Sequence, residues 1–204
     1  GVAVDGSHAV YAGHAEGAAV AAALAATWFD RRLPAPRGLV ALMPRGGAGA
    51  VQPGMLARLP RDTRFLLVAA DAGPAVDDAA DIALWDGTAH LPAAWRNRLV
   101  VETDAHGVPP LVADWRLPFT AGPHGAVDAL DWYGPWKWLD ALTACGYRNA
   151  DCRYAFGGTP EQTGLGVWAD GRPVTPARLA APRRPVRFDA WLPIAGQGVV
   201  RPRR

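Results

Sequence analysis

Apolar runs along the chain alternate with helical or loop segments. Four of these runs have the composition of β-strands, and they cover residues 8–13, 37–43, 63–70 and 97–103. Their apolar character is continuous rather than alternating, which is typical of strands covered on both faces. Helices are predicted between them, at 15–31 and at 76–86. The strand–helix order predicts right-handed crossovers and a parallel sheet, so the fold class is α/β.

A longer helical pattern follows at 125–147, and Pro135 is expected to kink it or to start it afresh. Trp132, Trp136 and Leu139 fall on one face of this helix. We expect this aromatic stripe to pack in the core, with a ligand platform as the alternative.

From Pro160 onward the chain is rich in Pro and Arg and shows little periodicity. It is interpreted as an extended segment lying over the surface, with a loose end. We therefore expect one domain over residues 1–176 and a C-terminal extension over 177–204.

Composition excludes some function classes. Half of the 204 residues are apolar and nine are tryptophan, so a sizeable core is expected. No run of 18 apolar residues is present, so no membrane span is predicted. A net charge of +2 indicates neither a nucleic-acid partner nor a membrane surface.

The first strand leads into Gly13-His14-Ala15-Glu16-Gly17 and then an alanine-rich helix. This is the G-x-S-x-G pattern with alanine in place of serine. The sharp turn from strand to helix requires small residues. Gly13 and Gly17 are expected to let neighbouring backbone approach, and the central residue, Ala15, is expected to have a strained backbone. Glu16 would offer its N–H at a helix start, where an oxyanion is stabilised. Paired glycines before a helix are common in α/β proteins, so a chance occurrence is the alternative.

Several stretches beyond this turn resemble one protein family. They are "GHAEGAAVAAALAA", "LVALMPRGG", "LVVETDAHGVPPLVADW", "DALDWYGPWKWLDAL" and "AFGGTPEQTGLGVWADGRPV". With them the chain resembles the C-terminal two-thirds of bacterial α/β-hydrolases. It is most similar to an often secreted, esterase- or lipase-like subgroup. The resemblance implies an α/β-hydrolase fold whose N-terminal strands are missing or supplied elsewhere.

The resemblance also locates the family's catalytic triad. The nucleophile position is Ala15, the acid position is Gly73 and the histidine position is Trp115, so all three are vacated. Serine acts only when a histidine takes its proton and an acid orients that histidine. The family comparison therefore implies a catalytically degenerate protein with a binding or structural role. A degenerate gene product with no selected function is a further alternative.

A carboxylic ester hydrolase is the other hypothesis, with surrogate residues or with only the nucleophile replaced. His106 follows the fourth strand and, with Asp104 or Asp71, would act as a base on water. A surface-loop histidine and an exposed turn aspartate are the alternatives. The Glu16 carboxylate is favoured at a helix start regardless of function. No cofactor is expected, because neither metal-ligand spacing nor a phosphate loop is present. The expected ligand of the cleft is a small ester-like or apolar molecule.

Cys145 and Cys152 enclose a six-residue loop. From spacing alone, a small disulfide and two reduced thiols are equally good interpretations, whereas a C-x-x-C motif is excluded. The subgroup commonly pairs its cysteines in the matching loop, and this implies a Cys145–Cys152 disulfide and an exported protein. The chain itself starts without a signal-peptide pattern, so a cytoplasmic protein is the alternative.

The relatives carry several strands before the one that matches 8–13, whereas only seven residues precede it here. We therefore expect this strand to lie at an open sheet edge, which is a liability for aggregation. The chain is then a fragment, or a segment of another polypeptide pairs with that edge.

Overall fold

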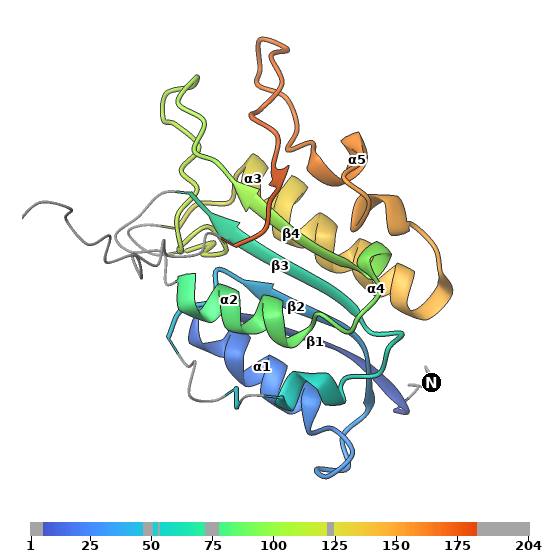
Figure 1. Cartoon of the computed structure of the whole chain (residues 1–204). Helices are drawn as coiled ribbons and strands as arrows, with labels where there is room; N and C mark the ends of the chain where they lie inside the picture. Colours follow the sequence, from blue (N-terminus) through green and yellow to red (C-terminus); the bar gives the residue numbers. More distant parts are fainter. Residues whose placement is uncertain (1–5, 47–50, 53, 72–77, 122–124, 183–204) are drawn as a thin grey trace, which may run out of the picture.

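A computed structural model describes residues 6–46, 51–52, 54–71, 78–121 and 125–182. Its centre is a single five-stranded sheet in the order β1-β2-β3-β4-β5 (Figure 1). The strands are β1 (His8–His14), β2 (Ala35–Leu42), β3 (Arg64–Ala70), β4 (Arg96–Val101) and β5 (Arg178–Leu179). The first four run parallel, and β5 pairs antiparallel with β4. The predicted α/β class and its four strands are confirmed, with strand ends within two residues.

The continuous apolar runs are explained by cover on both faces of the sheet. Along β3, Phe65 and Leu67 belong to one apolar cluster, and Leu66 and Val68 belong to the other. All four side chains are fully buried. Because alternate residues point to opposite faces, a strand covered on both sides needs no polar positions.

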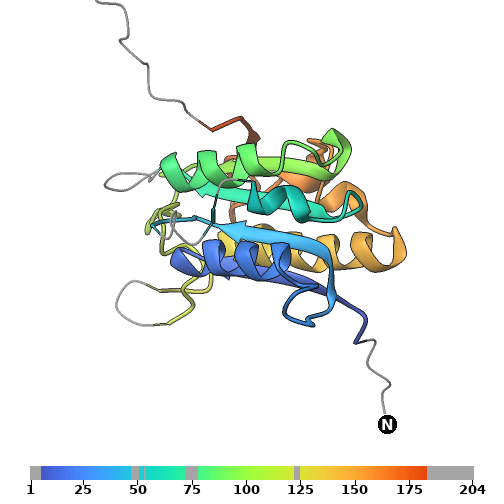
Figure 2. The same cartoon turned by 60° about the horizontal axis from the view of Figure 1, so that its bottom comes forward.

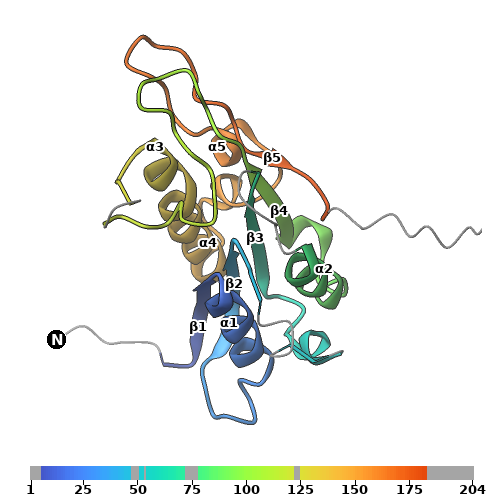
Figure 3. The same ribbon diagram turned by 90° about the vertical axis from the view of Figure 1, so that its left-hand side faces the viewer.

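Helices form a layer on each side of the sheet (Figures 2 and 3). On one side lie α1 (Glu16–Ala26), the short 3₁₀ helix η2 (Met55–Arg58) and α2 (Asp78–Gly87). On the other lie α3 (Ala129–Asp131) and α4 (Lys137–Arg148). Shorter helices are η3 (Ala93–Trp95), η5 (Cys152–Tyr154) and α5 (Pro160–Thr163).

The first predicted helix is shorter than the prediction of 15–31. It ends at Ala26, where the Thr27 N–H donates to the carbonyl oxygens of Ala23 and Leu24 at 3.0 and 3.2 Å. The chain then turns back toward β2, and Arg32 has a φ of 54°. The predicted helix was too long because the prediction rested on alanine-rich composition. The helix ends at this turn, and no glycine or proline marks that end in the sequence.

The helix predicted at 125–147 is three pieces. A single turn of α3 is followed by a wide π-helical segment η4 (Trp132–Trp136) and then by α4. Gly134 is not helical, with φ −103° and ψ −113°, and Pro135 follows it. The interruption expected at Pro135 is therefore present, but the residue with the non-helical backbone is Gly134, one position earlier.

The expected packing of the aromatic stripe in the core is wrong. Trp132 is 60% exposed, and Trp136 and Leu139 are each 39% exposed. The break at Gly134 ends the helical register of the first turn, and a different face of α4 contacts the sheet. That face carries Trp138, Ala141, Leu142 and Cys145, at the spacing of an amphipathic helix. Trp138 is fully buried and donates its indole N–H to the carbonyl oxygen of Gln162 at 2.8 Å.

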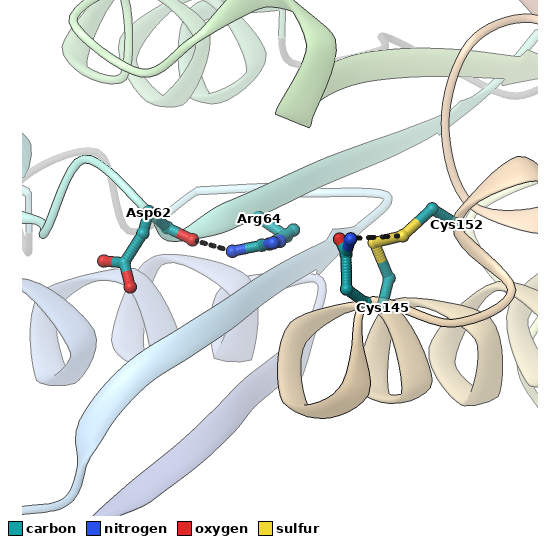
Figure 4. The surroundings of a disulfide bond; sticks show 5 residues. Asp62, Arg64, Cys145 and Cys152 are labelled. Carbon is teal, nitrogen blue, oxygen red and sulfur yellow. Dashed lines mark hydrogen bonds between the residues drawn. A yellow bond between two sulfur atoms is a disulfide. The ribbon is translucent and has the colours of Figure 1, made fainter.

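The Cys145–Cys152 disulfide implied by the resemblance is confirmed. It joins the last turn of α4 to η5, with a Cα–Cα distance of 4.8 Å (Figure 4). The figure also shows Arg64, whose guanidinium donates to the carbonyl oxygen of Asp62 at 2.6 Å. The Cys145–Cys152 disulfide fixes the segment after α4 against the side of the sheet that α4 covers.

The sheet continues past residue 176, where the extension was expected to begin. Arg178 and Leu179 of β5 pair with Val100 and Leu99 of β4. Residues 183–204 of the predicted extension lie outside the described residues. Within the described part of the chain, no helix has the length and apolar character needed to cross a membrane.

Candidate functional site

The turn between β1 and α1 has the backbone that its sequence pattern suggests. Ala15 joins the strand to the helix with φ 50° and ψ −123°, a region that residues with a side chain rarely adopt. Its N–H donates to Leu42 O at 3.0 Å, and its carbonyl accepts from Ala18 N at 3.1 Å. Ala15 is 7% exposed. These two backbone hydrogen bonds hold Ala15 in a strained conformation, although its side chain is an unreactive methyl group.

The two glycines of the motif differ in the space around them. A Cβ at Gly13 would lie 2.0 Å from the carbonyl oxygen of Gly17, so the strand and the helix approach too closely for any side chain. A Cβ at Gly17 would meet nothing within 4 Å. The close approach expected at both glycines therefore applies at Gly13 alone.

An aromatic cluster lies beside this turn. His14 donates from Nε2 to the carbonyl oxygen of Trp115 at 2.6 Å, and the two rings are parallel within 4° with centroids 6.3 Å apart. Phe119 contacts both rings edge-on, with centroids 5.4 Å from each. The Arg45 guanidinium lies over the indole of Trp115, 5.0 Å from its centre. The sequence pattern did not indicate Arg45 or Phe119, because nothing local marks residues that meet only across the fold.

Two of the three positions that the resemblance assigns to a catalytic triad therefore meet. Trp115 is 101 residues from His14 in the chain, yet its backbone is hydrogen-bonded next to Ala15. Gly73, the third position, lies outside the described residues. Glu16 begins α1, and its exposed carboxylate lies 3.7 Å from where a Cβ at Gly46 would be. The methyl of Ala15 and the indole of Trp115 supply neither a nucleophile nor a base.

The predicted surrogate base, His106, belongs to a different hydrogen-bond network. It lies in the loop that follows β4, beside the bridge between Asp104 and Leu111. Its Nε2 is bonded to Asp170 Oδ2 at 2.8 Å, and its Nδ1 accepts from Arg172 at 3.0 Å. Both ring nitrogens are thus engaged within a surface network.

The carboxylates expected to assist His106 have other partners. Asp71 Oδ1 accepts from the Thr103 N–H at 3.1 Å, and no hydrogen bond between Asp71 and His106 is present among the described residues. Asp104 accepts from the backbone N–H of His106 at 2.9 Å, not from its ring. The structure therefore does not assemble the predicted surrogate pair.

Asp104 has a structural role that the sequence did not reveal. It is 6% exposed and accepts from Thr175 N at 2.8 Å and from the Trp168 indole at 3.2 Å, besides the bond from His106. These hydrogen bonds, led by the one from Thr175, lower the pKa of Asp104 to about 2. A Cβ at Gly107 would lie 2.1 Å from the Trp168 ring. The loop after β4 and the "VWADGRPVT" segment are thereby held together.

A cavity of about 440 Å³ lies between η2 and α2, away from the Ala15 turn. Its lining residues are Val51, Gln52, Gly54, Leu56, Ala57, Ala83, Asp86 and Gly87. Among the described residues, no group of three or more His, Cys, Asp or Glu side chains has the arrangement of a metal site.

No protein-family model matches the chain, and no curated protein or solved structure matches it either. The geometry around Ala15 is therefore what indicates a function.

Proposed function

We propose that this protein is a catalytically degenerate member of the α/β-hydrolase fold with a binding or structural role. The observation that carries the proposal is the backbone of Ala15, with φ 50° and ψ −123°, at a strand-to-helix turn. Holding a residue with a Cβ in so sparsely populated a backbone region costs on the order of 1–3 kcal/mol. Alanine gains nothing chemical there, whereas a nucleophile at this turn would be presented at the end of the sheet.

The position of Trp115 supports the same reading. The family's histidine is expected at this residue, and its backbone lies within hydrogen-bond distance of His14, next to Ala15. The turn that would carry the family's nucleophile lies beside the loop that would carry its histidine, but Ala15 and Trp115 occupy those two positions. Such a site has the family's layout and none of its catalytic chemistry. The indole, Phe119 and the Arg45 guanidinium offer an apolar surface with one cation, which favours a small apolar or ester-like ligand.

An active ester hydrolase is the second candidate, and it receives less support. A surrogate base must reach the reacting atoms within about 3 Å or through one water. Both ring nitrogens of His106 are bonded elsewhere, Nε2 to Asp170 and Nδ1 to Arg172.

We also propose that the protein functions outside the cytoplasm. Its two cysteines form a disulfide, and such bonds persist in oxidising compartments.

The test restores the nucleophile alone. We expect Ala15→Ser to hydrolyse p-nitrophenyl butyrate no faster than the wild type, and to remain unlabelled by a fluorophosphonate probe, because no base activates the hydroxyl. Ala12→Ser is the matched control, since it adds a hydroxyl on the same strand at an exposed position. Labelling of Ala15→Ser well above this control would show that a working base exists, and would favour the hydrolase. Loss of that labelling in Ala15→Ser/His106→Ala would identify His106 as the base.

A further inference from the structure

Two loops on the β4 side of the sheet are joined to each other at two places. One is the loop after β4, residues 102–111, and the other is a hairpin over residues 166–175. Both extend away from the sheet (Figures 1 and 3). The first contact is the buried carboxylate of Asp104, which accepts from Thr175 N at 2.8 Å and from the Trp168 indole at 3.2 Å. Because the pKa of Asp104 is about 2, the carboxylate stays ionised and this contact does not respond to mild acid.

The second contact is His106, which is bonded to the hairpin through both ring nitrogens. Nε2 lies 2.8 Å from Asp170 Oδ2, and Nδ1 lies 3.0 Å from a guanidinium nitrogen of Arg172. A guanidinium only donates, so Nδ1 is the nitrogen without a hydrogen, and Nε2 carries the hydrogen that Asp170 accepts. The arrangement is therefore that of a neutral imidazole in one defined tautomer.

The charged groups that face His106, among the described residues, favour different protonation states of its ring. From the hairpin they are the Asp170 carboxylate, which favours the cation, and the Arg172 guanidinium, which opposes it. From the loop after β4 it is Asp104, which accepts from the His106 backbone N–H at 2.9 Å. The Trp168 ring, with its centroid 5.6 Å from that of His106, is uncharged.

Protonation of His106 affects its two bonds in opposite ways. The bond to Asp170 is kept, because Nε2 still donates and the pair becomes an ion pair. The bond to Arg172 is lost, because Nδ1 then carries a hydrogen and two cationic donors face each other at 3.0 Å. The hairpin keeps its own bonds, from Trp168 N to Arg172 O at 2.8 Å and from Arg172 N to Asp170 Oδ1 at 3.0 Å. Protonation therefore frees the Arg172 side chain without unfolding the hairpin.

We propose that His106 is a proton-sensitive latch between the two loops. In its neutral form it holds the Arg172 side chain against the loop after β4. In its protonated form it keeps Asp170 and releases Arg172, so mild acid exposes a guanidinium beside a new imidazolium charge. Asp104 keeps the bases of the two loops together in both states. The inference is independent of the proposed function, because it involves neither the Ala15 turn nor a ligand.

Double-mutant cycles at two pH values test the proposal. Urea unfolding is measured for the wild type, His106→Ala, Arg172→Ala and the double variant at pH 8.0 and pH 5.5, on either side of the usual range of imidazole protonation. We expect the interaction of the two side chains to change the unfolding equilibrium about threefold to fivefold at pH 8.0, and to vanish or become repulsive at pH 5.5. The interaction of His106 with Asp170 should be at least as large at pH 5.5 as at pH 8.0. All three residues are exposed, so the variants are expected to fold.

The matched control is the nearby ion pair of Arg178 with Glu102, whose side chains are 44% and 34% exposed. Neither of its groups changes charge between the two pH values, so its interaction should be the same at both. A His106–Arg172 interaction that is absent at pH 8.0, or equally favourable at both pH values, would overturn the proposal.

Nuclear magnetic resonance of the His106 ring gives an independent readout. Multiple-bond ¹H–¹⁵N spectra distinguish the two neutral tautomers, and loss of the signals in His106→Ala assigns them. We expect the tautomer with hydrogen on Nε2 at pH 8.0, and nuclear Overhauser contacts between the His106 ring and the Arg172 side chain that are lost at pH 5.5. Contacts from His106 to the Trp168 ring should remain. Hydrogen on Nδ1 at pH 8.0, or contacts to Arg172 that survive in acid, would exclude the latch.

Discussion

Gly13 and Gly17 look equivalent in the sequence, yet the structure predicts opposite responses to the same substitution. In Gly13→Ala the new Cβ would lie 2.0 Å from Gly17 O, 2.4 Å from Gly17 C and 2.7 Å from Ala18 N. Ordinary contacts between carbon atoms are about 3.5–4.0 Å. All three neighbours are backbone atoms, so no side-chain rotation relieves the overlap and α1 must move away from β1.

The magnitudes follow from these distances. Overpacking a well-packed site commonly costs about 1–3 kcal/mol, and a backbone overlap of this size belongs at the upper end or beyond. We therefore expect Gly13→Ala to lower the free energy of unfolding by about 3 kcal/mol or more. Gly17→Ala meets nothing within 4 Å and replaces glycine in the first helical turn. It should raise the free energy of unfolding by about 0.5 kcal/mol.

Urea unfolding followed by tryptophan fluorescence, with the disulfide intact, measures both variants against the wild type. The control is internal, because the two substitutions add the same methyl group four residues apart. Equal stability of Gly13→Ala and the wild type would refute the close approach of β1 and α1. So would equal losses in the two variants.

Three further predictions concern stability. Ala15→Gly should raise the melting temperature, with a gain of about 1 kcal/mol in the free energy of unfolding, because glycine adopts the backbone of residue 15 (φ 50°, ψ −123°) without strain; an unchanged or lower melting temperature would argue against strain. Arg98 and Asp81 form an ion pair with side chains 5% and 1% exposed, so Asp81→Ala should cost about 3–5 kcal/mol in urea unfolding. Much of that loss should return in Asp81→Ala/Arg98→Met, and a further loss in the double variant would contradict the unpaired-charge explanation. Because the folded pKa of Asp104 is depressed to about 2, its carboxylate stabilises the fold above pH 4, and this contribution is lost as the pH falls toward 2. Asp104→Asn should therefore cost about 2 kcal/mol at pH 7 and progressively less between pH 5 and pH 2, and a cost independent of pH would exclude this origin.

The sheet could be predicted from the sequence more fully than the candidate site. The four parallel strands were predictable because burial on both faces leaves a continuous apolar run, as in Phe65–Val68. The turn at Ala15 was indicated by its flanking glycines, although only Gly13 is required by space. The aromatic stripe was mispredicted because a non-helical Gly134 changes which face of the following helix is inward. The 3.6-residue period assigns residues to one face only while the segment between them stays helical.

The sequence by itself determined the α/β class, the strand positions and the presence of alanine at the centre of the Gly13–Gly17 turn, because each depends on local composition or on a single residue. Only the tertiary structure decided which distant residues meet. Trp115 reaches His14 across 101 residues, and His106 is paired with Asp170 and Arg172 rather than with Asp71. Such contacts depend on how strands are ordered and loops are packed, and no local pattern of apolar and polar residues records them.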